Sequence, residues 1–167
     1  ERLNKRQLRL MLDFVPNHMG PDHAWVEKHP DYFVSGTPTD IQREPQNYTR
    51  VRRGKKKMIL AFGRDPYFDG WPDTFQLDYS NPAAAEAMKQ ELLRISGQCD
   101  GVRCDMAMLL LPEVFEKTWQ RKSQPFWTTA IEAVREKHPD FLFLGEVYWD
   151  LEWTLQQAGF DYTYDKR

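Results

Sequence analysis

Short apolar segments alternate with segments of helical periodicity over most of this 167-residue chain. Four apolar segments predict strands, at residues 7–15, about 100–106, 141–147 and 160–164. Three segments between them predict helices, at residues 81–96, 126–137 and about 151–158. The predicted strands are apolar on both faces, as in parallel sheets that helices cover on both sides. The pattern therefore predicts an α/β fold with a parallel sheet built from strand–helix–strand units.

Residues 20–78 interrupt this alternation. The segment is rich in proline, glycine and aromatic residues, has no long periodic stretch, and is far longer than an ordinary connection between elements. Segments of this kind form functional loops or small subdomains. We therefore expect an inserted, loop-rich subdomain at 20–78 and one α/β part made of residues 1–19 and 79–167.

A basic run, Arg52-Arg53-Gly54-Lys55-Lys56-Lys57, lies inside the insert. It could bind nucleic acid, or it could be the solvated tip of a hairpin. No aromatic residues are interleaved with the basic ones to stack on bases, which favours the hairpin tip. The 23 basic and 25 acidic residues of the whole chain also argue against nucleic acid or an acidic membrane as the main partner.

The cysteine count and the apolar stretches exclude several classes of protein. Cys99 and Cys104 are too few for a disulfide scaffold or a four-ligand zinc site. The longest apolar stretch, residues 106–111, is far shorter than the roughly 20 residues that span a bilayer. No signal-peptide pattern opens the sequence. Two reduced thiols favour the cytoplasm, and nothing else in the sequence indicates the compartment.

Charged clusters end three of the predicted strands. They contain Asp13, Arg103 and Glu146, in the sequences Asp-Phe-Val-Pro-Asn-His, Gly-Val-Arg-Cys-Asp and Gly-Glu-Val-Tyr-Trp. The carboxyl ends of parallel strands form the active-site face of α/β proteins. A charge within an apolar strand is costly unless it is paired, so we expect Arg103 to neutralise a neighbouring carboxylate. Arg103 and Asp105 are two residues apart and share one side of the strand, whereas Cys104 faces the helices.

Asp105 and Glu146 end two strands that one helix separates, so the two carboxylates belong on adjacent strand ends. Taken alone, Asp105 could simply form a buried salt bridge with Arg103. As a pair, the carboxylates suit cleavage of a glycosidic bond, one as nucleophile and the other as acid and then base. Burial and the neighbouring negative charge are expected to raise the pKa of the acid, while Arg103 keeps the nucleophile ionised.

In this order, the three clusters resemble the first three conserved regions of the alpha-amylase family of glycoside hydrolases. Residues 71–82, Trp-Pro-Asp-Thr-Phe-Gln-Leu-Asp-Tyr-Ser-Asn-Pro, resemble the segment that closes the small inserted domain of that family. The resemblance implies a (β/α)8 TIM barrel, with about its third to sixth strands in this chain. Residues 20–78 would be the domain inserted after the third strand, and the chain would be the central part of a longer catalytic barrel.

The resemblance also implies roles for individual residues. Asp105 would be the nucleophile that forms the glycosyl-enzyme intermediate, and Glu146 the general acid/base. Arg103 would orient Asp105, and Asp13 would support Arg103 at the base of the pocket. His18 would hydrogen-bond the sugar ring beside the scissile bond.

Three more residues complete the expected site. Tyr148 and Trp149, beside the acid, are candidate platforms for sugar rings. Asn17 matches a position that binds calcium in many members of the family. Calcium is not favoured, because no set of oxygen ligands is evident around Asn17 in the sequence. No other cofactor is implied.

The chain also departs from the family pattern. Met108 and Leu109 stand where members often place Lys and His to contact the sugar on the leaving side. The fourth conserved region, a His-Asp pair whose Asp stabilises the transition state, is absent. We therefore expect these 167 residues alone to be nearly inactive and to need the remainder of the barrel.

The function that the resemblance implies is a retaining enzyme for alpha-glucosidic bonds. Its partner would be an alpha-glucoside or an oligosaccharide, without nucleic acid or membrane. Two alternatives stay open: an alpha-glucan or glucosyl transferase of the same family, in which a sugar instead of water attacks the intermediate, and a non-catalytic member that acts as a partner-binding domain. The second alternative predicts loss of the nucleophile or the acid, yet Asp105 and Glu146 are both present.

Overall fold

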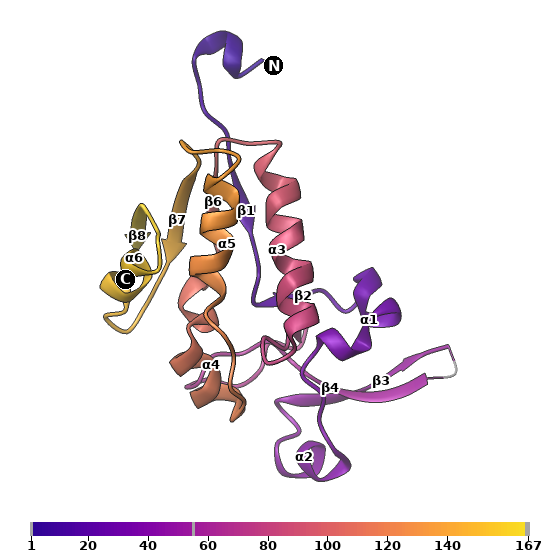
Figure 1. The fold of residues 1–167 in the computed structure, drawn as a ribbon. Helices are drawn as coiled ribbons and strands as arrows, with labels where there is room; N and C mark the ends of the chain where they lie inside the picture. The colour runs from indigo at the N-terminus through magenta and orange to yellow at the C-terminus, as the bar shows by residue number, and fades with distance from the viewer. Residues whose placement is uncertain (1, 55, 166–167) are drawn as a thin grey trace. The chain divides into compact units, whose positions relative to one another are not determined.

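The structure, a computed structural model, describes residues 2–54 and 56–165 and divides into two compact units (Figure 1). The first, here called the sheet unit, consists of the residues up to Pro16, Glu86–Leu111 and the residues from Pro125 onward. The second, here called the insert unit, consists of Asn17–Ala85 and Pro112–Gln124. Each unit has its own strands and its own buried side chains.

Four parallel strands form the centre of the sheet unit, in the order β1-β6-β7-β8. Their bounds are β1 Met11–Phe14, β6 Gly101–Cys104, β7 Leu142–Glu146 and β8 Tyr162–Tyr164. This confirms the predicted α/β fold with a parallel sheet. The strands are shorter than the predicted apolar runs because flanking residues make their hydrogen bonds elsewhere. The Leu10 amide, for example, donates to the carboxylate of Asp100 at 2.7 Å.

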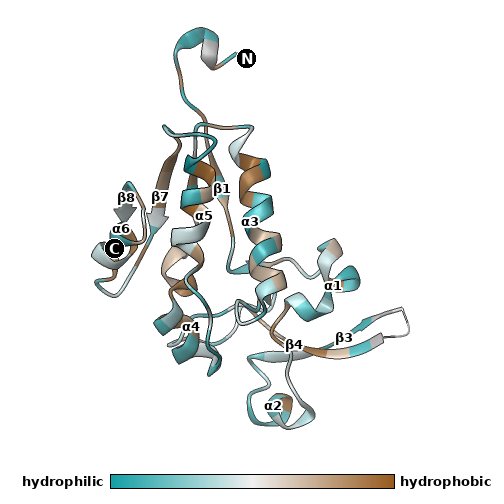
Figure 2. Cartoon of the chain, viewed as in Figure 1, coloured by the Kyte–Doolittle hydropathy of each residue, from teal (hydrophilic) through white to brown (hydrophobic). Residues whose placement is uncertain are grey.

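Three helices begin and end near the predicted residues: α3 covers Pro82–Ser96, of which the residues from Glu86 onward belong to this unit, α5 covers Phe126–Arg135 and α6 covers Glu152–Gln157. The Asn81 side chain accepts the Ala83 amide at 3.0 Å and so caps α3, whose first residue is Pro82. Hydrophobic and hydrophilic residues are interspersed along α3 and α5 (Figure 2). Such amphipathic helices bury one side against a core. Two short 3-10 helices, η1 at Asn4–Arg6 and η3 at Ala107–Leu110, complete the unit.

Trp127 of α5 is the centre of the aromatic core that attaches this helix to the sheet. Its ring lies 4.8 Å from that of Phe160 and 6.4 Å from that of Phe14, both edge to face. Its indole N–H donates to the carbonyl of Ala107 at 2.8 Å, so the one polar atom of this buried ring is satisfied. These contacts join α5 to both the strand ends and the turn that follows β6.

The insert unit has two small antiparallel sheets: β2 (His18–Met19) pairs with β5 (Phe75–Gln76), and β3 (Tyr48–Arg53) forms a hairpin with β4 (Lys56–Ala61). Its helices are α1 (Ala24–Lys28), η2 (Pro30–Tyr32), α2 (Pro38–Arg43) and α4 (Pro112–Trp119). Thr37 begins α2 through a reciprocal capping box with Asp40. Of the basic run identified in the sequence, Arg52 and Arg53 end β3, and Lys56 and Lys57 begin β4, so these residues form a hairpin; Lys55 lies outside the described residues.

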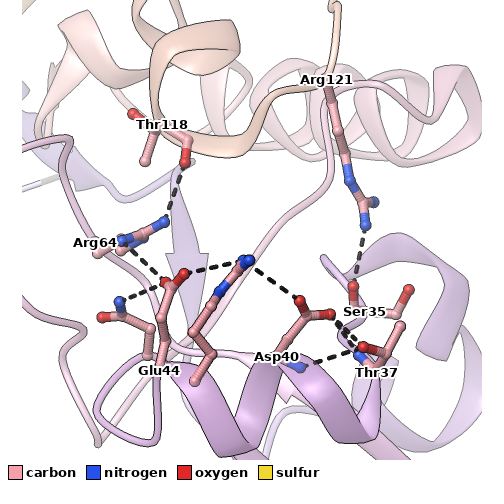
Figure 3. Close-up of polar contacts among 9 residues, drawn as sticks. Ser35, Thr37, Asp40, Glu44, Arg64, Thr118 and Arg121 are labelled. Carbon is pink, nitrogen blue, oxygen red and sulfur yellow. Dashed lines mark hydrogen bonds and ion pairs between the residues drawn. The ribbon is translucent and has the colours of Figure 1, made fainter.

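The boundary between the units differs from the predicted one, because residues 112–124 pack with the insert (Figure 3). The Arg64 guanidinium donates to the Thr118 carbonyl at 3.1 Å and lies over the Trp119 ring at 4.8 Å. Arg121 forms an ion pair with the buried Asp78 and donates to the Ser35 carbonyl at 3.0 Å. The insert therefore draws in a segment that the sequence pattern had assigned to the α/β part.

No helix among the described residues is long and apolar enough to cross a membrane.

Candidate active site

One guanidinium group joins the side chains at the carboxyl ends of β6, β7 and β8. Arg103 donates from Nη1 to Asp105 Oδ1 at 2.8 Å and from Nη2 to Glu146 Oε2 at 2.5 Å. Its Nε donates to the Tyr164 hydroxyl at 2.8 Å. Burial opposes the charged form of Arg103, but these hydrogen bonds and the two carboxylates outweigh it and raise the pKa of the guanidinium. The expected neutralisation of strand-end carboxylates by Arg103 is confirmed.

Strand register explains why these side chains meet. Arg103 of β6 lies opposite Asp13 of β1 on one side and Leu144 of β7 on the other. Glu146 is two residues beyond Leu144 and so points to the same side of the sheet. Asp13 Oδ1 lies 3.5 Å from Arg103 Nη1, and 71% of the Asp13 side chain is exposed. Asp13 therefore forms a peripheral part of the same cluster.

Glu146 is the most buried acid of the cluster, with 5% of its surface exposed. Besides Arg103, it accepts the Tyr148 hydroxyl at 2.8 Å and the Met106 amide at 3.1 Å. Burial alone raises the pKa of Glu146, but these donors, the Arg103 charge and a hydrogen bond with Asp105 together lower it. The expectation that this carboxyl has a raised pKa is therefore wrong for this arrangement, because hydrogen bonds to the ionised form outweigh burial.

Met106, the residue after Asp105, has a left-handed backbone with φ 45°. Residues other than glycine rarely adopt this backbone conformation, which costs of order 1 kcal/mol. Here it begins the turn into η3 and directs the Met106 amide to Glu146 Oε2. The turn after β6 thus donates a hydrogen bond to the carboxylate of Glu146, and it also contains Asp105.

The two expected sugar platforms follow Glu146 directly. Burial and the hydrogen bond to Glu146 raise the pKa of Tyr148 to about 12, so its hydroxyl remains a donor at neutral pH. Trp149 and Asp150 have φ 66° and 59°, two consecutive left-handed residues without a glycine. Such strain persists only where the surroundings hold it, and it is found at functional sites more often than elsewhere. The segment after β7 therefore has a defined shape beside the carboxylates.

His18 and Asn17 belong to the insert unit and are described within it. The His18 ring packs edge to face on Trp71 at 5.2 Å. Asn17 is buried, and its amide exchanges hydrogen bonds with the Gln76 amide, at 3.0 and 3.2 Å. Its side-chain oxygen thus accepts from Gln76. Among the described residues, no group of three or more His, Cys, Asp or Glu side chains is arranged to hold a metal.

Two members of the cluster, Tyr164 and Met106, were not among the residues predicted from the sequence. Tyr164 carries no charge, and its partner Arg103 is distant in the sequence. Only the position of Tyr164 at the end of the fourth predicted strand could have indicated its role. Met106 contributes its backbone amide, which any residue other than proline has, so the residue type could not indicate this contact. Both extend the set of groups that hold Arg103 and Glu146.

A family model described as "Alpha amylase, catalytic domain" matches residues 1–163. The chain belongs to the alpha-amylase family. A curated relative, an alpha-1,4-glucan:maltose-1-phosphate maltosyltransferase of Bifidobacterium animalis subsp. lactis, is 26% identical over 148 residues, which are 89% of this chain and 16% of the relative. An alpha-glucosidase of Culex pipiens is 31% identical over 114 residues, which are 63% of this chain and 20% of that one.

A solved structure shows the same fold. The alpha-amylase of Lactobacillus plantarum matches with a TM-score of 0.60 and 25% identity, over 95% of this chain and 30% of that one. The four parallel strands are therefore part of a (β/α)8 barrel, as the sequence predicted. The chain spans 16% of the length of the maltosyltransferase.

Proposed function

We propose that this amylase-family chain carries the nucleophile and the acid/base of a retaining enzyme that cleaves alpha-glucosidic bonds. The observation that supports this most directly is the shared guanidinium: Arg103 holds Asp105 and Glu146 together at adjacent strand ends. Retaining glycosidases need two carboxyl groups close enough to act on one anomeric carbon. The remaining strands of the barrel would supply the carboxylate that stabilises the transition state.

In this mechanism Asp105 attacks the anomeric carbon and forms a glycosyl ester, while Glu146 gives a proton to the departing glycosidic oxygen. Water then attacks the same carbon, Glu146 takes a proton from it, and Asp105 leaves as the carboxylate. The lowered pKa of Glu146 in this arrangement suits the second step, which needs a base. The first step needs protonated Glu146, so substrate binding must weaken the Arg103–Glu146 contact and leave the cation to Asp105.

The other residues would position the substrate. Tyr148 holds Glu146 through its hydroxyl, and with Trp149 it would offer an aromatic face to a sugar ring. Asp13 would support Arg103, and His18 would hydrogen-bond the sugar. No step of this scheme requires a cofactor. Asn17 would act as a structural amide through its bonds to Gln76.

Transfer to a sugar acceptor is the second candidate, because one relative is named a maltosyltransferase. Both reactions pass through the same intermediate, and they differ only in whether water or a sugar hydroxyl attacks it. The products decide between them: a transfer reaction elongates added maltose, whereas a hydrolase forms no oligosaccharide longer than the maltose that was added.

The test uses the gene product that contains this sequence, as wild type, Asp105→Asn, Glu146→Gln and the control Asp140→Asn, an exposed acid at the other end of the sheet. Aryl alpha- and beta-glucosides and alpha-glucosyl fluoride are the substrates, and NMR follows the anomeric configuration. We expect alpha-selective cleavage with retention, lost in Asp105→Asn. Glu146→Gln should lose the aryl glucosides but keep the first step with the fluoride, whose departure needs no proton, so fluoride is released in a burst and turnover is then slow because the second step lacks its base. Cleavage of no glucoside by folded protein would instead support a partner-binding role.

A further inference from the structure

The Arg103 guanidinium has a hydrogen-bond partner at each of its three nitrogen atoms. Nη1 donates to Asp105 at 2.8 Å, Nη2 to Glu146 at 2.5 Å and Nε to the Tyr164 hydroxyl at 2.8 Å. The three nitrogens lie in one rigid plane. A contact at Nε therefore also determines where the two Nη atoms point, and so how closely the cation approaches each acid.

Tyr164 differs from the other two partners because its hydroxyl accepts a hydrogen bond without a negative charge. A third carboxylate at this position would compete with Asp105 and Glu146 for the cation. The hydroxyl satisfies the Nε–H, which is costly to leave unpaired because only 24% of the Arg103 side chain is exposed. Tyr164 thus orients the cation and leaves its charge to the two acids.

Strand pairing gives the Tyr164 hydroxyl a defined position. Tyr164 of β8 is the register partner of Glu146 of β7, and its carbonyl accepts the Val147 amide at 3.0 Å. The neighbouring Thr163 points to the opposite side of the strand, where its hydroxyl accepts from the Gln156 side chain of α6 at 2.9 Å. These contacts tie β8 to the strand that carries the acid and to the helix behind it.

Arg103 lies among acids and tyrosines from every strand of the sheet. Besides Glu146 and Tyr164, these charged and titratable side chains are Asp13 of β1, Asp105 after β6, Tyr148 after β7 and Asp165 after β8. Arg103 is the one cation of this set. A change in the orientation of its guanidinium therefore alters the field at both Asp105 and Glu146.

We propose that Tyr164 is a positioning residue of the active site, whose hydroxyl turns the Arg103 guanidinium so that one cation reaches both Asp105 and Glu146. The catalytic meaning of this role rests on the proposed function, whereas the orientation itself rests on the contacts of β6, β7 and β8. Without the hydroxyl, the guanidinium can rotate away from the plane in which it reaches both acids, and its contact with Glu146 weakens.

The experiment compares Tyr164→Phe with Tyr162→Phe in the gene product that contains this sequence. Tyr164→Phe removes the hydroxyl and keeps the ring, whose centre lies 5.8 Å from the guanidinium carbon of Arg103. Tyr162 is the matched control, since it lies on the same side of the same strand but is 61% exposed. NMR titration of the glutamate carboxyl carbons measures the pKa of Glu146.

We expect Tyr164→Phe to raise the pKa of Glu146 by about half a pH unit or more, because a less closely held cation favours the ionised form less. Tyr162→Phe should leave the pKa of Glu146 unchanged. Arg103→Gln separates an effect through Arg103 from a direct effect of the hydroxyl. In the Arg103→Gln background, Tyr164→Phe should change the pKa of Glu146 no further.

Kinetics give a second measurement, in which a positioning residue differs from a residue that contacts the sugar. Tyr164→Phe should lower kcat and kcat/KM by about tenfold and leave KM unchanged, since the group on which it acts serves the reaction and not substrate binding. Both limbs of the pH profile of kcat/KM should move to higher pH, because Asp105 and Glu146 each lose part of the cation.

Four results would overturn the proposal. These are an unchanged pKa of Glu146 in Tyr164→Phe, an equal rise in Tyr162→Phe, an equally large rise in the Arg103→Gln background, and a raised KM with unchanged kcat. The second would mean that β8 loosens as a whole, and the last that Tyr164 contacts the substrate. The titration needs no activity, so a gene product that cleaves no glucoside would contradict the proposed function while the pKa of Glu146 still decides the role of Tyr164.

Discussion

Arg103 Nη2 lies 2.5 Å from Glu146 Oε2, so a cation of one strand bonds to the acid of the next. The same guanidinium bonds to Asp105 at 2.8 Å. Two carboxylates that share one cation cannot titrate independently, because a change in the charge of either alters the field at the other. The protonation of Glu146 thus depends on how Arg103 divides its contacts, which is the property that a residue acting first as acid and then as base requires.

Replacing Arg103 with Gln should make stability depend more weakly on pH. The pKa of Glu146 is lowered in the folded protein, so its ionised form adds stability above the usual carboxyl pKa, and this is lost as pH falls through the lowered pKa. Without Arg103 much of that gain disappears. We expect the free energy of unfolding to fall by about 1–3 kcal/mol at about pH 7 and by less at about pH 4, where the carboxyls begin to protonate.

Urea unfolding of wild type, Arg103→Gln and Arg103→Lys at the two pH values measures this effect. Arg103→Lys keeps the charge but loses the fork that reaches both acids, so it should recover only part of the stability. An equal loss at both pH values would show that Arg103 acts through packing and not through the carboxylates.

Tyr148→Phe should raise the pKa of Glu146 towards its ordinary value. The substitution removes the hydroxyl that donates to Glu146 Oε1 at 2.8 Å and leaves the ring in place. Loss of a bond to an ionised carboxylate should also cost about 1.5–3 kcal/mol of stability at neutral pH. NMR titration of the Glu146 carboxyl carbon gives the pKa directly. Tyr162→Phe, on an exposed tyrosine of β8, is the control and should change nothing. An unchanged pKa in Tyr148→Phe would contradict the contact.

The sequence predicted the parts of this site that depend on strand periodicity. Arg103 and Asp105 are two residues apart, and Glu146 ends the next strand, so period and parallel topology bring them together. The direction of the Glu146 pKa shift was not predictable, because it depends on how many donors reach the carboxylate. One donor is the backbone of Met106 in a left-handed turn, and another is the hydroxyl of Tyr148.

In the fold, too, some features were predictable from the sequence and others were not. Apolar runs and helix caps predicted the sheet and its helices within a few residues. That residues 112–124 belong to the insert unit was not predictable. Their place depends on ion pairs and ring contacts with residues far away in the sequence, such as the pair of Arg121 with Asp78. Pairings of this kind leave no periodic signal, since each partner alone is an ordinary charged residue.

Arg121→Gln should destabilise the insert unit. Arg121 pairs with Asp78, whose side chain is 8% exposed, so the substitution leaves a nearly buried carboxylate without its cation. It also removes the bond to the Ser35 carbonyl. We expect a loss of about 1–3 kcal/mol, since Arg121 is itself one third exposed. Lys122→Gln, an exposed neighbour, is the control.

A double-mutant cycle with Asp78→Asn separates this pair from general packing. If the two side chains act through one another, the double variant should be more stable than the sum of the single losses predicts. In the Arg121→Gln variant, backbone amides of residues 112–124 and around Asp78 should exchange hydrogen faster than in the wild type. Additive losses would argue that Arg121 and Asp78 contribute independently.

The two cysteines should differ strongly in reactivity. Cys104 is fully buried on β6, and burial raises the pKa of its thiol well above the ordinary value. Cys99 is half-buried, and burial raises its pKa less. Because only the thiolate attacks, a raised pKa slows modification at a given pH. Iodoacetamide at about pH 8 should therefore label Cys99 more slowly than free cysteine, and Cys104 only after the protein unfolds.

Mass spectrometry of peptides over a time course measures both rates, and denatured protein is the control, in which the two thiols should react alike. The Cys99 rate should increase as pH rises, because its thiol ionises above the ordinary range. Labelling of Cys104 at the Cys99 rate in folded protein would mean that β6 opens readily from its neighbours β1 and β7. The strand that carries Arg103 could then not hold the two carboxylates in the arrangement described.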